Sequence, residues 1–95
     1  MTKKEAYEKK IESQLQEWKS DIDKMKAKID KVDAETQLEY YKQIEDLRTK
    51  QEYAQKKLAE LKASSESAWE DLKVGIDLAW TSLEEAVKSA SNRFR

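Results

Sequence analysis

Cysteine and histidine are both absent from this 95-residue sequence, which also has no proline and a single glycine. Without Cys and His, the chain can form no disulfide, no thiolate or imidazole metal site, and no nucleophile or general base of those types. Acidic pairs such as Glu84 and Glu85 diverge by about 100° on a helix, so we interpret them as surface acids. We therefore expect no catalytic residue, no cofactor, no metal site and no small-molecule substrate.

The sequence also lacks an excess of charge of either sign and any long apolar run. Its 19 Lys and Arg residues are interspersed with 20 Asp and Glu residues. Nucleic-acid binding needs clustered cations that displace counterions, so we expect no nucleic-acid partner. No window approaches the roughly 20 apolar residues of a membrane-spanning helix, and no apolar segment of a secretory signal follows Met1. These features predict a chain without a secretory signal that does not span a membrane.

Helix-forming residues dominate the composition of the chain. Ala, Glu, Lys, Gln and Leu are abundant, and the near absence of Gly and Pro leaves almost no turn chemistry. Oppositely charged residues recur at helical spacing, as in Glu52 and Lys56, with the acid on the favourable N-terminal side. The composition predicts a single all-α domain over residues 1–95.

Two apolar repeats in steps of four and three residues predict a coiled coil. The first, which we call the first seam, consists of Tyr7, Ile11, Leu15, Trp18, Ile22, Met25, Ile29 and Val32. The second consists of Tyr40, Ile44, Leu47, Gln51, Ala54, Leu58 and Leu61. They are joined through Thr36 by two steps of four, a phase shift that a coiled coil absorbs by changing its winding. We therefore expect one long helix over residues 3–63.

The serine-rich stretch after Ala63 predicts a turn at residues 64–67, with Ser67 and Glu70 forming a capping box. A last helix at about residues 68–93 follows. Its apolar residues occupy a stripe of roughly 80°: Trp69, Leu72, Ile76, Trp80, Leu83, Val87, Ala90 and Phe94. This helix is long enough to fold back antiparallel along the second repeat, forming a helical hairpin.

The alternative fold is a three-helix bundle with an extra turn near Asp33 to Thr36. A capping box can be drawn from Thr36 to Glu39, but no Gly, Asn or Pro stops the preceding helix. In the hairpin, nothing within the chain covers the first seam, and an apolar stripe of that length exceeds what monomers usually expose. We therefore expect a homo-oligomer, most simply an antiparallel dimer, with another helical protein as the rival partner.

Three stretches resemble a family of small bacterial coiled-coil proteins associated with stress responses. They are EAYEKKIESQLQEW, EYYKQIEDL and AWEDLKVGIDLAWTSLEEAVKSASNRF. The resemblance implies a bacterial cytoplasmic setting and no assigned enzymatic activity, and it transfers no site residue.

The function that the sequence predicts is that of a non-enzymatic, self-associating scaffold or stress-related interaction protein. The alternative is attachment to a membrane surface through the last helix, which has the apolar face of an interfacial helix. That helix lacks the cationic polar face that anionic lipids attract.

Overall fold

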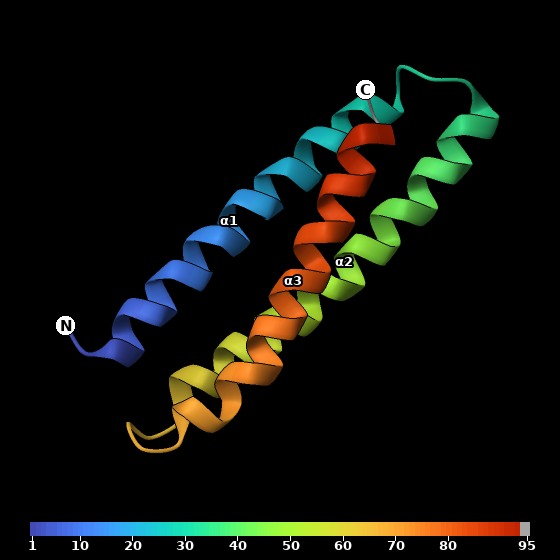
Figure 1. The fold of residues 1–95 in the computed structure, drawn as a ribbon. Coiled ribbons are helices and arrows are strands. Elements are labelled where there is room, and N and C mark those ends of the chain that lie inside the picture. The colour runs from blue at the N-terminus through green and yellow to red at the C-terminus, as the bar shows by residue number, and fades with distance from the viewer. Residues whose placement is uncertain (94–95) are drawn as a thin grey trace.

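The computed structural model describes residues 1–93, which form three helices: α1 (Lys3–Ile29), α2 (Ala34–Ala63) and α3 (Trp69–Arg93). The three helices lie alongside one another in an elongated bundle of 52 × 19 × 17 Å (Figure 1). The expected all-α class is confirmed. The expected single helix over residues 3–63 is wrong, because the chain turns back after Ile29.

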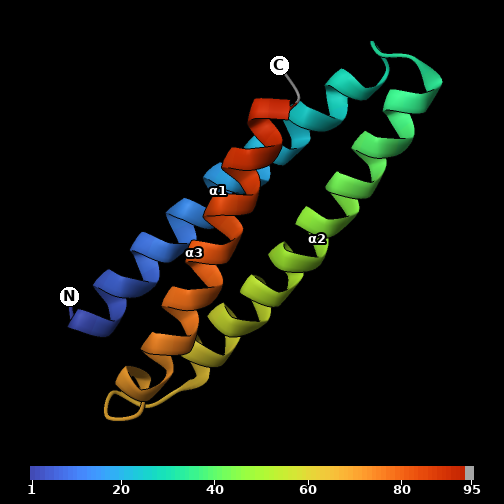
Figure 2. The same ribbon diagram turned by 45° about the vertical axis from the view of Figure 1, so that its right-hand side comes forward.

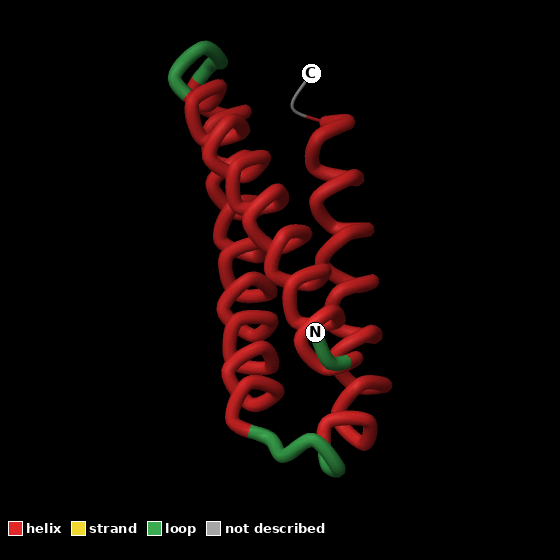
Figure 3. Tube along the Cα trace, turned by 90° about the vertical axis from the view of Figure 1, so that its left-hand side faces the viewer, coloured by secondary structure: helices red, strands yellow, loops and turns green. Residues whose placement is uncertain are grey.

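Each helix runs opposite to the one before it, and α3 contacts both α1 and α2 (Figures 2 and 3). Contacts between distant residues fix this arrangement. Glu12 near the start of α1 pairs with Lys62 near the end of α2, and the Tyr40 hydroxyl near the start of α2 donates to the Arg93 carbonyl oxygen, 3.1 Å away. The last helix therefore returns along α2, as the sequence predicts, but it shares that helix with α1.

The turn between α1 and α2 needs neither glycine nor proline, so the sequence here lacks the residues that usually mark the end of a helix. Asp30 keeps right-handed helical angles, whereas Asp33 is extended, with φ −70° and ψ 169°. The Asp33 carboxylate accepts a hydrogen bond from the Thr36 backbone N–H at 2.8 Å, and so caps the start of α2. No non-glycine residue among those described has a positive φ, so no left-handed residue is required here.

The second turn falls where it was expected, but Ser65, and not Ser67, supplies the side-chain bond in it. The Ser65 side chain and carbonyl oxygens both accept from the Ala68 N–H, at 3.2 and 3.1 Å, and the Ser65 carbonyl also accepts from the Trp69 N–H. α3 begins at Trp69, so Ser65 closes the turn that leads into the helix, and it lies two residues before the Ser67 cap that the sequence predicts.

A continuous apolar core runs the length of the bundle and draws on all three helices. Its largest fully buried side chains are Ile22 from α1, Leu47 and Leu61 from α2, and Ile76 and Leu83 from α3. At about 25 cal/mol per Å² of apolar surface removed from water, this core is the main source of stability. The bundle thus satisfies within one chain the burial that the hairpin left to a partner.

Candidate interaction surface

The first seam is a core element of the folded chain. Ile11, Leu15, Trp18, Ile22, Met25 and Ile29 are all buried, Tyr7 packs against the core from its edge, and Val32 is half-buried in the first turn. The premise that nothing in the chain covers this seam is therefore wrong. Its cover is the trough between α2 and α3, which the turn at residues 30–33 brings within reach.

The residues expected to pack within the chain lie where they were placed, with one outside the described residues. Those buried are Ile44, Leu47, Ala54, Leu61, Trp69, Ile76, Trp80, Leu83, Val87 and Ala90. Tyr40, Leu58 and Leu72 are partly buried against them. Phe94 lies outside residues 1–93. The indole N–H of Trp80 donates to the Ile11 carbonyl oxygen at 3.0 Å, so this anchor is also oriented by a polar contact.

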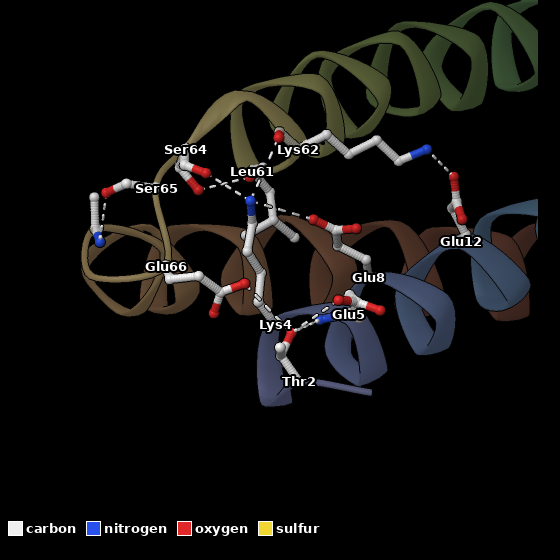
Figure 4. Close-up of polar contacts among 11 residues, drawn as sticks. Thr2, Lys4, Glu5, Glu8, Glu12, Leu61, Lys62, Ser64, Ser65 and Glu66 are labelled. Atoms are coloured by element: carbon white, nitrogen blue, oxygen red, sulfur yellow. Dashed lines mark hydrogen bonds and ion pairs between the residues drawn. The ribbon is translucent and has the colours of Figure 1, made fainter.

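One charged side chain among the described residues is buried. It is that of Lys4, which joins the start of α1 to the end of α2. The Lys4 ammonium donates to the Ser64 carbonyl oxygen at 2.5 Å, and the Lys62 carbonyl and the Glu8 carboxylate lie 3.4 and 3.7 Å from it (Figure 4). Carbonyls at the C-terminus of a helix lack intrahelical donors and carry partial negative charge. Lys4 therefore fixes the start of α1 to the end of α2.

A second polar cluster joins α1 to α3 around Tyr7. Its hydroxyl donates to the Asp77 carboxylate, its ring centroid lies 5.6 Å from that of Trp69, and the Lys73 ammonium lies 5.5 Å from the same ring. Burial, followed by the bond and charge of Asp77, raises the pKa of Tyr7 well above its usual value. The neutral phenol donates to Asp77 and so joins α1 to α3.

Neither a metal centre nor a membrane span emerges from residues 1–93. No three acidic, histidine or cysteine side chains in that range come close enough together to hold a metal ion. Over the same residues, no helix is both long and apolar enough to cross a bilayer.

The outer face of α3 carries apolar side chains that the core does not use. Val74 and Leu78, one turn apart, are 69% and 68% exposed. Asp71 and Glu85 lie seven residues on either side of Leu78, so all four side chains share one face. This face, which we call the α3 ridge, is apolar at its centre and acidic at both ends.

Beside the α3 ridge lies a shallow hollow between α2 and α3. Thr49, Lys50, Tyr53, Ala79 and Ser82 line this hollow, which has a volume of about 260 Å³. Apolar atoms form most of its wall, and the Tyr53 side chain is 54% exposed at its edge. Lys50 and Lys57 lie about one turn to either side of Tyr53, and the Lys57 ammonium lies 5.4 Å from the Tyr53 ring. Both lysines also pair along α2, Lys50 with Asp46 at 3.7 Å and Lys57 with Glu60 at 3.5 Å, so the α2 side of the hollow carries paired charges.

Comparison with known proteins gives no relative on which to place this surface. No family model matches the chain, and neither a curated protein nor a solved structure does so.

Sequence reasoning missed Lys4 and the hollow for different reasons. Lys4 stands seven residues before Ile11, so extending the first seam back by one more step of three from Tyr7 would have found it. Tyr53 belongs to neither apolar repeat. Its relation to Ala79 depends on how α2 packs against α3, which no spacing within one helix can reveal.

Proposed function

We propose that this chain is a non-enzymatic helical scaffold that acts by associating with a second copy of itself through the outer faces of α2 and α3. The observation that carries the proposal is the adjacency of a convex apolar ridge, Val74 and Leu78, to an apolar hollow at Tyr53 and Ala79. A two-fold axis applied to such a face can place the ridge of each copy in the hollow of the other.

Charge contributes less than shape to the choice of a second copy as the occupant. The α3 ridge is acidic at its ends, through Asp71 and Glu85. The α2 side of the hollow carries Lys50 and Lys57, each of which pairs with an acid of α2. A two-fold axis parallel to the helices faces α3 of one copy with α2 of the other, so each acidic flank faces one of these lysines. Such complementarity sets orientation and association rate more than affinity.

Light scattering after size exclusion tests this proposal. At tens of micromolar, the protein should elute with twice the 11.2 kDa mass of the chain. Leu78→Glu should shift it to monomer, because the substitution places a charge in the apolar centre of the interface. The matched control is Leu38→Glu, which changes an equally exposed leucine (66%) near the other end of α2 and should leave the dimer intact.

A monomeric wild type at these concentrations, or equal effects of the two substitutions, would contradict the proposal. Trp18→Glu would test self-association only if the first seam were the interface between chains, so it is not a test of this proposal. Trp18 is only 7% exposed in the core, so the charge would unfold the bundle rather than probe an interface.

The proposal includes the setting implied by the family resemblance, a stress-associated protein of the bacterial cytoplasm. Membrane attachment through α3 is the second candidate, favoured by the apolar stripe of that helix. In the bundle this stripe faces the core, so lipid binding requires α3 to leave α1 and α2 and expose Trp69, Trp80 and their buried neighbours.

A further inference from the structure

The trough between α2 and α3 holds α1 through contacts that depend on the sequence of α1 and not on which chain supplies it. We propose that this trough also accepts α1 from a second copy, so that two chains exchange their α1 helices by straightening the turn at residues 30–33. The partner is a second copy of this chain. The inference is independent of the α3 ridge and of the dimer proposed above.

The first argument is that α1 and α2 have compatible faces. At 100° per residue, an unbroken helix over residues 3–63 would carry the buried residues of α1 and α2 within one sector of about 100°. Straightening the turn therefore keeps both buried faces on the same side of one rod about 90 Å long. Two antiparallel rods would then lay α1 of each chain along α2 of the other, with α3 completing each three-helix unit.

The second argument is that the first part of the turn is close to helical already. Asp30 has φ −67° and ψ −10°, and the N–H groups of Lys31 and Val32 donate to carbonyl oxygens three residues back, as in a tightened last turn of helix. Asp33 is extended and must change its ψ angle. Because the described residues include no positive φ, straightening needs no left-handed residue to convert.

The third argument is that the polar contacts between α1 and the rest of the bundle can all form again when α1 is exchanged between chains. Lys4 binds the Ser64 carbonyl, Glu12 pairs with Lys62, and the Ile11 carbonyl accepts from Trp80. Each link joins α1 to α2 or α3, so each re-forms between chains when α1 changes partner. The exchanged dimer loses the Asp33 cap and gains the backbone hydrogen bonds of a continuous helix.

Crosslinking between two single-cysteine chains tests the exchange, and the natural sequence has no cysteine to interfere. One chain carries Glu12→Cys and the other Lys62→Cys, at positions whose side chains pair across α1 and α2. The two are mixed in urea, refolded together at high concentration and treated with a short bismaleimide. Exchange predicts a crosslinked dimer of about twice 11.2 kDa, at several times the yield of either variant alone.

Substitutions in the turn show whether the crosslink reports exchange. Proline is favoured at the first position of a helix and requires an extended residue before it, as Asp33 is, but it breaks a continuous helix. Ala34→Pro in both chains should therefore lower the crosslinked yield at least tenfold. Asp33→Ala, which removes the cap that holds the turn, should raise it at least twofold.

Yield no higher than that of the single variants, or yield unchanged by both turn substitutions, would overturn the exchange. Circular dichroism confirms that the Ala34→Pro chain is folded, and Asp33→Ala gives an opposite change that loss of folding does not mimic. Leu78→Glu in both chains separates the two proposals, because it should abolish the outer-face dimer and leave the crosslink unchanged. A dimer sensitive to Leu78→Glu but without crosslink would overturn the exchange alone.

Discussion

Gly75 is the only glycine of the chain, and it lies within α3, away from any turn. A Cβ atom built there meets nothing within 4 Å, and its φ is not positive. Neither close packing within the chain nor backbone conformation therefore requires glycine at this position. The residue costs helix stability without a compensating contact inside the bundle.

Gly75→Ala should stabilise the monomer by about 1 kcal/mol, the difference in helix propensity between the two residues. For a domain of this size, that corresponds to a rise in melting temperature of about 4–8 °C. Thermal unfolding at low protein concentration measures it. Ala79→Gly, one turn further along α3, is the reverse control and should destabilise by at least a similar amount. A lower melting temperature for Gly75→Ala would contradict the prediction.

Lys4 shows how one polar contact fixes the packing of two helix ends. Lys4→Met keeps the apolar stem of the side chain and removes the ammonium that binds the Ser64 and Lys62 carbonyl oxygens. We expect a loss of about 1.5–3 kcal/mol, as for hydrogen bonds to charged groups. Urea unfolding of Lys4→Met measures the loss, with Lys3→Met as the control at an exposed neighbour. Equal effects of the two substitutions would show that the contact contributes nothing.

At the scale of the helices, the sequence predicts faces better than ends. The stripe from Trp69 to Val87 and the repeat from Ile11 to Ile29 are spaced to be buried on one side of a helix, and they are. The sequence predicts the turn after α1 only as an alternative, near Asp33 to Thr36, because the usual signals are Gly, Asn and Pro. Here Asp33 interrupts the helix by adopting an extended conformation. The two consecutive steps of four through Thr36 were the visible trace of that interruption.

The second turn shows that the local sequence pattern does not identify which serine makes the bond in the turn. Ser64, Ser65 and Ser67 are chemically equivalent candidates, and the capping-box pattern favours Ser67 because Glu70 follows it by three. In the bundle, Ser65 bonds the Ala68 N–H while Ser64 bonds the Leu61 carbonyl oxygen. Which serine caps depends on where packing starts α3, and packing is not contained in the local pattern.

The cap at Asp33 should make part of the bundle's stability depend on pH. Hydrogen bonding to the Thr36 side chain and backbone lowers the pKa of Asp33, because these bonds favour the carboxylate. A carboxyl whose pKa is lower in the folded chain stabilises it above the unfolded value of about 3.9, and this contribution is lost as the pH falls through the folded pKa.

Asp33→Asn keeps a capping oxygen but does not titrate, so it is the matched variant. Wild type should be more stable than Asp33→Asn near pH 6, and the difference should shrink as the pH falls to about 3. Urea unfolding of both proteins across this range measures it. A difference that stays constant with pH would mean that the Asp33 charge contributes nothing to the turn.

For the whole molecule, the decisive property is that one chain covers its own apolar surface. The first seam, unpartnered in a hairpin, enters the trough between α2 and α3, and the apolar stripe of α3 faces the same core. No spacing within a single helix distinguishes this closed arrangement from two long helices in different chains. The choice depends on the four-residue turn, since both arrangements bury the same residues.

The closed bundle argues most directly against membrane binding. The surface left to lipid on α3 consists of Val74 and Leu78 between acidic residues, which offers little apolar area and repels anionic headgroups. We therefore expect the protein to stay with the aqueous fraction when floated with neutral or anionic vesicles. Ile22→Glu, which opens the core from α1 and leaves α3 unchanged, is the comparison that exposes the stripe.

The structure also decides which optical measurement can test that expectation. Trp18, Trp69 and Trp80 are all less than 10% exposed, so their emission is already that of buried indoles, and insertion into lipid would shift it little further. Quenching by brominated lipids reports contact directly and is the better probe. Flotation of most of the wild-type protein, together with quenching of its tryptophans, would mean that α3 leaves the bundle on a bilayer. Flotation and quenching of Ile22→Glu alone would show that α3 can bind lipid and that folding of α1 onto it prevents this.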